Sequence, residues 1–195
     1  MLRPFILACL IALASIAPAR ATSVLPLPLD GIVSGAAVAF EGTCVSNSTR
    51  RDPVSGLVAT FTTFAVHDVL RGSLGTQYTI KQVGGELPAE GIAFRAHGVP
   101  TFKVGQDYVV FLPAPSSIGF SSPVGLSQGR FVVTPGAAGN EVTNGRDFRD
   151  MTSGIPDTEF PPGLAQKVKH AAQPVRRADL AEFKELVRSR IGAGK

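Results

Sequence analysis

The chain is poor in the residues that build covalent or metal-bound frameworks. Its 195 residues include two cysteines, three histidines and no tryptophan. Of the cysteines, Cys9 lies in the apolar stretch at the amino terminus, so Cys44 remains as a single free thiol once that stretch is removed. A lone cysteine excludes an internal disulfide, and leaves open a buried side chain, an intermolecular disulfide or a reactive thiol. The folded body must therefore be held together by its hydrophobic core.

Long apolar runs are also scarce. The longest, residues 5–16, is too short for a membrane-spanning helix, which needs about 20 apolar residues. Arg3 precedes this run, and Ala19 and Ala21 follow it with the small-x-small spacing of a signal-peptidase site. The sequence therefore predicts a signal peptide over residues 1–21 with cleavage near Ala21, and a secreted protein that is periplasmic or extracellular.

Net charge is small and unevenly distributed. The full chain carries 19 Lys and Arg against 15 Asp and Glu, a formal charge of +4. Residues 163–195 hold eight of the basic residues and three of the acidic ones, so the body before them is slightly acidic. An acidic body argues against nucleic acid as a partner, whereas the basic end leaves open a weak contact with an anionic surface. The cations considered for that contact are Arg176, Arg177, Lys184, Arg188 and Arg190.

Five segments have the composition of β-strands. They are rich in β-branched and aromatic residues and are separated by turn-forming Gly, Pro, Asn and Asp. The segments are residues 38–45, 57–70, 77–83, 108–112 and 130–133. No strong helix intervenes, so the pattern predicts an all-β domain over residues 22–135, a five-stranded antiparallel barrel of the OB type. A β-sandwich is the alternative that the spacing leaves open.

The chain changes character after residue 135. Residues 136–178 are rich in Gly, Pro and Asp, which predicts an irregular connection. Asp179 and Glu182 then have the spacing of a capping box, which is typical of a helix start. Apolar residues follow along a single stripe at helical spacing. We therefore expect a C-terminal amphipathic helix over residues 179–192.

The order of these strands and turns resembles a known family. The stretches GTCVS, FTTFAVHDVLRG, YTIKQVGG, GVPTFKVGQDYVVFL and VGLSQGRFVV follow one another over residues 38–133. A strand entry of the form F-x-x-G-x-x-Y-x-x-F is present as Phe102, Gly105, Tyr108 and Phe111. Together they resemble secreted bacterial proteins with an OB-fold, netrin-like domain, the class that includes the tissue inhibitors of metalloproteinases. The resemblance implies a binding role toward a secreted metalloprotease or an envelope component, and assigns no site residue.

One motif has the form of a catalytic turn. GLSQG, residues 125–129, fits G-x-S-x-G, which presents the nucleophilic serine in many esterases between a strand and a helix. Here a loop rich in Ser, Pro and Gly precedes the motif and a strand follows it. We therefore expect Gly125 and Gly129 to serve a structural turn. A serine hydrolase with Ser127 as nucleophile and His170 as base is the alternative function.

No motif indicates a metal or a cofactor. His67, His97 and His170 are far apart in the sequence and form no H-E-x-x-H or other close ligand pair. The dipeptide Gly84-Gly85 predicts a turn, and it lacks the lysine of a phosphate-binding loop. We expect no catalytic residue, no metal and no cofactor, and the main function that the sequence favours is a secreted non-catalytic binding module.

Overall fold

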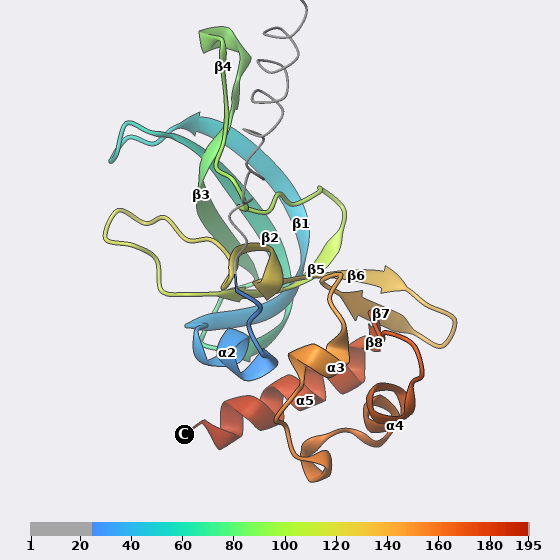
Figure 1. Ribbon diagram of the computed structural model, residues 1–195. Helices are drawn as coiled ribbons and strands as arrows, with labels where there is room; N and C mark the ends of the chain where they lie inside the picture. Colours follow the sequence, from blue (N-terminus) through green and yellow to red (C-terminus); the bar gives the residue numbers. More distant parts are fainter. Residues whose placement is uncertain (1–24, 195) are drawn as a thin grey trace, which may run out of the picture.

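A single antiparallel sheet forms the body of the protein. The computed structural model describes residues 25–194, so the predicted signal peptide, its cleavage site and Cys9 lie outside the described residues. The sheet has eight strands in the order β4-β3-β2-β1-β5-β6-β7-β8 (Figure 1). Within residues 25–194, no helix is long and apolar enough to cross a membrane.

The longest connections between the elements are residues 96–106, before β5, and residues 113–125, after it. The strands are β1 (Val38–Arg51), β2 (Val58–Arg71), β3 (Gln77–Leu87), β4 (Ile92–Arg95), β5 (Asp107–Leu112), β6 (Arg130–Pro135), β7 (Asn140–Thr143) and β8 (Ala178–Asp179). The helices are α2 (Leu29–Ser34), α3 (Phe148–Met151), α4 (Pro162–His170) and α5 (Leu180–Ala193), with 3-10 turns η1 (Pro88–Glu90), η2 (Leu126–Gly129) and η3 (Asp157–Glu159). A β-rich antiparallel fold with a C-terminal helix is confirmed, but eight strands in an open sheet replace the five that we expected.

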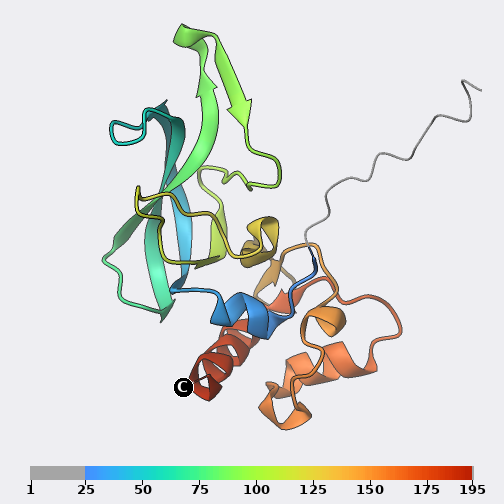
Figure 2. The same cartoon turned by 60° about the vertical axis from the view of Figure 1, so that its left-hand side comes forward.

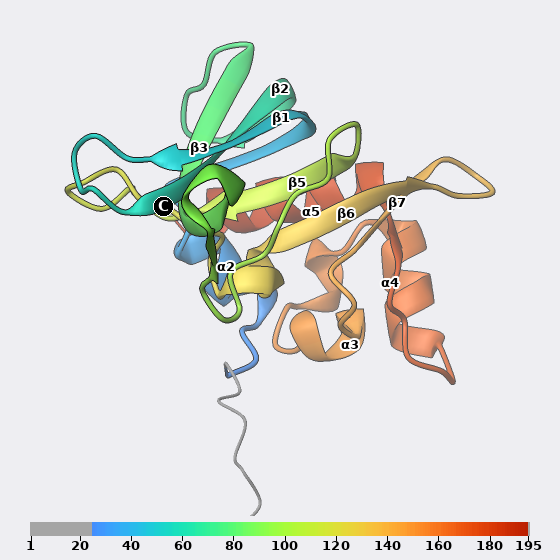
Figure 3. The same ribbon diagram turned by 90° about the horizontal axis from the view of Figure 1, so that it is seen from above.

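Irregular pairing bends the long strands β1 and β2. Their register shifts at three places, and such bulges increase the bend and twist of a strand. Gly42 lies beside one shift, where a Cβ atom would come within 2.5 Å of the Ala65 carbonyl oxygen. Only glycine allows this close approach. The strands β1, β2 and β3 therefore curve together (Figure 3).

Two hydrophobic clusters lie on the two sides of β5. The helix-side cluster joins Val109 and Phe111 of β5 to the buried residues of β6, α2, α3, α4 and α5. The inner cluster joins Tyr108 and Val110 to the curved part of β1, β2 and β3, and its buried members are Phe40, Cys44, Phe64, Ile80, Phe102, Tyr108, Val110 and Leu112. Alternate residues of a strand point to opposite faces, so β5 serves both clusters.

The helix α5 docks as the sequence predicts. The Asp179 carboxylate accepts a hydrogen bond of 3.0 Å from the backbone N–H of Glu182, which caps the first turn. Phe183 is fully buried in the helix-side cluster, with its ring 4.7 Å from that of Phe131 between centroids. Figure 2 shows α5 and α2 at the end of the molecule opposite the β3–β4 hairpin.

Ion pairs join the polar side of α5 to the rest of the protein. The Lys184 ammonium lies 2.9 Å from the Asp68 carboxylate, and the Arg188 guanidinium lies 2.7 Å from the same group. Arg190 lies 2.7 Å from Asp30 of α2. Burial opposes the charge on Asp68, but hydrogen bonds from Lys184 and Arg188 outweigh it and lower the pKa of Asp68. These three cations of the basic end therefore contact carboxylates of the protein itself.

The expectation of an irregular connection over residues 136–178 is wrong, because this segment contains β7, α3, η3 and α4 and ends on the first residue of β8. The Asp147 carboxylate caps α3 by accepting from the backbone N–H of Arg149. Leu164 and Val168 of α4, four residues apart, are buried in the helix-side cluster. The elements are short, and packing against β6 and α5 stabilises them where local sequence preference is weak.

Acid should destabilise the fold through three carboxylates. Hydrogen bonds from Ser55 and Lys81 lower the pKa of Asp52, and those from Arg149 lower the pKa of Asp147, as α5 does for Asp68. A carboxyl group with a lowered pKa in the folded state stabilises the fold above its unfolded pKa of about 3.9, and this stabilisation is lost as the pH falls through the folded value.

We therefore expect the Tm, measured by circular dichroism, to fall steadily between about pH 5 and about pH 2. The Asp68→Asn variant should have a lower Tm at neutral pH and a shallower fall in acid, because one of the three linked groups is gone. A Tm that stays constant over this range in the wild-type protein would contradict the assignment.

Candidate functional site

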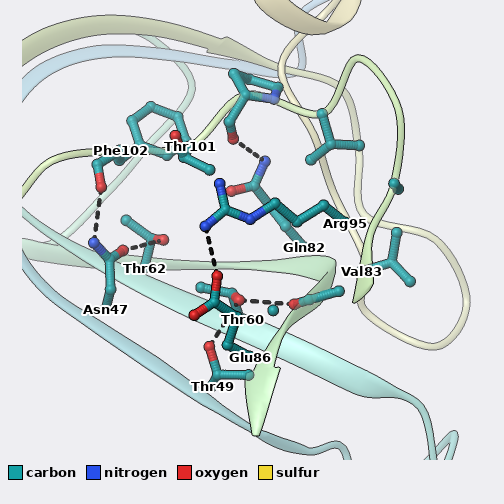
Figure 4. A pocket seen from close by; sticks show the side chains of 15 residues that line it. Asn47, Thr49, Thr60, Thr62, Gln82, Val83, Glu86, Arg95, Thr101 and Phe102 are labelled. Atoms are coloured by element: carbon teal, nitrogen blue, oxygen red, sulfur yellow. Dashed lines mark hydrogen bonds and ion pairs between the residues drawn. The ribbon is translucent and has the colours of Figure 1, made fainter. Parts of the chain in front are cut away.

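A pocket of about 260 Å³ lies at the β3–β4 hairpin, and none of its described lining residues belongs to a helix. It lies between the strands β1, β2 and β3 and the segment of residues 95–102 that follows β4 (Figure 4). Its polar floor carries hydroxyl and amide side chains, and we call the site the threonine pocket. The floor residues are Asn47, Thr49, Thr60, Thr62 and Gln82.

Strand register brings these floor residues together. Thr49 of β1 pairs with Thr60 of β2, which in turn pairs with Gln82 of β3. Asn47 pairs with Thr62 one step along the same face. Residues two apart on a strand share a face, so one pleated surface presents all five side chains to the pocket.

Internal hydrogen bonds engage the hydroxyl protons of the floor threonines and one N–H of each floor amide. The Thr62 hydroxyl donates to Asn47 Oδ1 at 2.7 Å, and Asn47 Nδ2 donates to the carbonyl oxygen of Phe102 at 2.8 Å. The Thr60 hydroxyl donates to a main-chain carbonyl oxygen of β3 at 2.7 Å. Thr60 and Thr49 are 3.0 Å apart, and because the single proton of Thr60 is already engaged, Thr49 is the donor between them.

Gly85 belongs to the strand β3 and to the wall of the threonine pocket, whereas the sequence predicts a turn at this position. Its φ of +142° favours glycine, and a Cβ atom would come within 2.4 Å of Thr49 Cγ2 and 2.5 Å of Thr60 Oγ1. Two adjacent glycines are a signal for close backbone approach within a strand, as well as for a turn. At Gly85 the glycine allows close backbone approach within the strand β3.

An exposed ion pair lies at the mouth of the pocket. The Arg95 guanidinium of β4 donates to the Glu86 carboxylate of β3 at 2.8 Å. The Arg95 and Glu86 side chains are 71% and 57% exposed, so the pair contributes little to stability. Figure 4 shows the Arg95 side chain extending across the space between Thr60 and Gln82. The two charges compensate each other, which leaves the mouth close to neutral.

The GLSQG motif forms the turn η2, and β6 follows it directly, with no helix. Gly125 and Leu126 both have positive φ, +61° and +60°. Ser127 is exposed on this turn, and His170 is exposed at the end of α4. No hydrogen bond joins Ser127 to His170 in the described part of the chain. A Cβ atom at Gly129 would come within 2.6 Å of the Val124 carbonyl oxygen, so glycine is needed for backbone packing.

Gln128 is the residue of this motif that makes the long-range contacts. Its Oε1 accepts from the backbone N–H of Leu27 at 2.7 Å and from Arg146 Nη1 at 2.8 Å. Its Nε2 donates to the Leu25 carbonyl oxygen at 3.0 Å. The motif therefore holds the start of the described chain against the sheet. A glutamine in a turn gives no sequence signal for such a role.

The histidines and the free thiol lie outside the threonine pocket. His67 Nε2 lies 2.7 Å from Thr43 Oγ1, which donates to the Asp107 carboxylate on the exposed side of β1. Cys44 is fully buried in the inner cluster, and burial raises the pKa of its thiol. Among residues 25–194, no group of three or more His, Cys, Asp or Glu is placed to hold a metal ion.

Of the five cations considered for an anionic surface, Arg177 also contacts the protein, since its Nη1 donates to Thr134 Oγ1 at 2.8 Å. Together with Lys184, Arg188 and Arg190 of α5, four of the five have partners within the structure. Comparison of the chain with protein-family models, with curated proteins and with solved structures finds no match.

Proposed function

We propose that this chain is a secreted, non-catalytic binding module that holds its partner at the threonine pocket. One observation carries the proposal: a concave site has a floor of hydroxyl and amide groups, and two of its members, Thr62 and Gln82, are only 1% and 3% exposed. Internal hydrogen bonds offset the cost of burying these two polar side chains. Their placement at a cavity supports a role in recognition.

The chemistry of the lining also supports binding. Among the described residues that line the threonine pocket there is no histidine, cysteine, aspartate or lysine. Glu86 is paired with Arg95, and the remaining polar groups are uncharged. Such groups orient a partner by hydrogen bonds.

The partner class that we propose is a secreted metalloprotease or an envelope component, following the resemblance to netrin-like domains. We propose for the same reason that the sheet contains an OB-type arrangement. The meander β1-β2-β3 and the return of β5 to the free side of β1 support it. Location outside the cytoplasm follows from the predicted signal peptide.

Affinity capture tests the proposal. Tagged protein of residues 22–195 is incubated with the secreted and envelope fractions of its source organism, and the retained proteins are identified. We expect one dominant partner, and at least a tenfold lower yield with Thr49→Tyr, whose ring fills the pocket. Thr63→Tyr is the matched control, because Thr63 also pairs with a threonine, Thr79 of β3, but on the opposite face of β2. Equal retention by both variants would place the contact elsewhere and overturn the proposal.

A fluorophosphonate probe, which labels reactive serines, tests the proposal that the protein is not a serine hydrolase. We expect no labelling of the wild-type protein, because no histidine bonds to the exposed Ser127 hydroxyl in the described chain. Labelling that disappears in Ser127→Ala would show a reactive serine and would replace the binding module with a serine hydrolase.

A further inference from the structure

We infer that the threonine pocket binds a neutral saccharide, held by its hydroxyl groups. The inference rests on the proposed function, because it names the ligand class of that same site. It follows from the hydrogen-bonding capacity that remains after the internal bonds of the pocket have been made. A hydroxyl group has one proton and two lone pairs, so each engaged threonine keeps its capacity to accept.

The floor of the pocket accepts hydrogen bonds. The Thr49 proton is directed to Thr60 and the Thr62 proton to Asn47, which leaves lone pairs on the oxygens of Thr49 and Thr62. Gln82 Nε2 donates to the Pro100 carbonyl oxygen at 3.2 Å, and no protein donor bonds to Gln82 Oε1 in the described chain. A ligand can therefore donate to these oxygens, while Asn47 Nδ2 and Gln82 Nε2 each keep one N–H beyond the bond that they make.

The mouth of the pocket donates hydrogen bonds. A guanidinium group has five N–H donors in a planar fork, and Arg95 directs Nη2 to Glu86. Figure 4 shows the rest of this guanidinium across the pocket, between the floor and the segment of residues 99–102. A ligand that enters meets acceptors on one side and the remaining Arg95 donors on the other.

Ligand classes differ in how they meet this arrangement. An anion brings only acceptors and would leave the lone pairs of the floor unpaired. An ammonium group brings only donors and would lie beside the Arg95 cation, while the nearby Glu86 carboxylate is already paired. A sugar hydroxyl both donates and accepts, carries no charge, and satisfies both sides at once.

The shape of the pocket agrees with this ligand. Val99, Pro100 and Phe102 give the segment opposite the floor an apolar wall, against which the C–H face of a sugar ring can pack. The volume of about 260 Å³ is below the range of about 300–1,000 Å³ that is usual for drug-sized ligands. One ring therefore fits, either as a free sugar or as one residue of a longer glycan.

Titration followed by NMR tests the inference with protein of residues 22–195. The probes are the methyl glycosides of glucose, galactose and N-acetylglucosamine, and a chitin trisaccharide, with lysine and inorganic phosphate as charged comparisons. We expect saturable shifts of Thr49, Thr60 and Thr62 methyl signals in the millimolar range with at least one saccharide. Tighter binding of the trisaccharide would identify a glycan chain as the source, and equal binding a free sugar.

Two variants test whether the saccharide binds at the threonine pocket. Thr49→Val keeps the shape of the side chain and removes its oxygen, so we expect about tenfold weaker saccharide binding. Thr63→Val makes the same change on the opposite face and should leave binding unchanged. No shift with any saccharide, binding of phosphate or lysine alone, or equal affinity of the two variants would overturn the inference. Pocket-dependent capture of a protein together with an absence of saccharide binding would leave the proposed function standing and remove the sugar.

Discussion

Phe183→Ala should destabilise the protein by about 3–5 kcal/mol and lower its Tm by about 10 °C. The Phe183 side chain is fully buried in the helix-side cluster. Its ring centroid lies 4.7 Å from that of Phe131 and 5.9 Å from that of Phe148. Truncation removes apolar surface from the cluster and leaves a cavity that α5 cannot close while its ion pairs hold it in place.

Thermal and urea unfolding of the variant measure this loss. Phe94→Ala is the matched control, because it makes the same change on a side chain that is 50% exposed on the edge strand β4. We expect it to alter the free energy of unfolding by no more than about 0.5 kcal/mol. Similar losses for the two variants would mean that α5 does not complete the core.

Gly85→Ala should cost about 2–4 kcal/mol and deform the threonine pocket. The added Cβ atom would overlap Thr49 and Thr60, at 2.4 Å and 2.5 Å, in a backbone conformation that alanine rarely adopts. Strand β3 or the two threonines must move apart to relieve the overlap. The hydrogen bond between the Thr49 and Thr60 hydroxyls would then lengthen, and the acceptor floor of the pocket would lose its order.

Urea unfolding separates the cost of the strained backbone from the cost of the overlap with Thr49 and Thr60. Gly91 also has positive φ, +65°, but no atom lies within 4 Å of where its Cβ would be. Gly91→Ala should therefore show the cost of backbone strain alone, about 1–2 kcal/mol. If Gly91→Ala proves as damaging as Gly85→Ala, close packing at the pocket is not what requires glycine there.

The main strands and the last helix were predictable because their signals are local. The apolar stripe and the Asp179 cap identify α5, and dense β-branched and aromatic residues identify β1, β2, β3, β5 and β6. The strands β7 and β8 were not predictable, since they have four and two residues and depend on pairing, β7 with β6 and β8 with β7. A closed barrel was predicted from five strands without an intervening helix and from the resemblance, whereas β4, β7 and β8 extend the sheet, which is open.

The candidate site was less predictable than the fold. Thr60 and Thr62 look like ordinary strand residues in the sequence, and Thr49 lies beyond the predicted strand of residues 38–45. They become one surface only through the bulged register of β1 and β2, which a single sequence does not specify. The GLSQG motif had a visible signal, but its one buried side chain beyond glycine is that of Gln128, and the motif is followed by the strand β6 and not by a helix.

The division of the core into two clusters also orders the folding of the chain in time. Every buried member of the inner cluster lies between Phe40 and Leu112, so that cluster is complete in sequence before the last third of the chain is made. The helix-side cluster needs Phe183, which arrives with the last residues. Since domains on a ribosome acquire their residues from the amino terminus, the body can close only when synthesis ends. With the signal peptide that we propose, the chain would thus still be open when an export machinery engages its first residues.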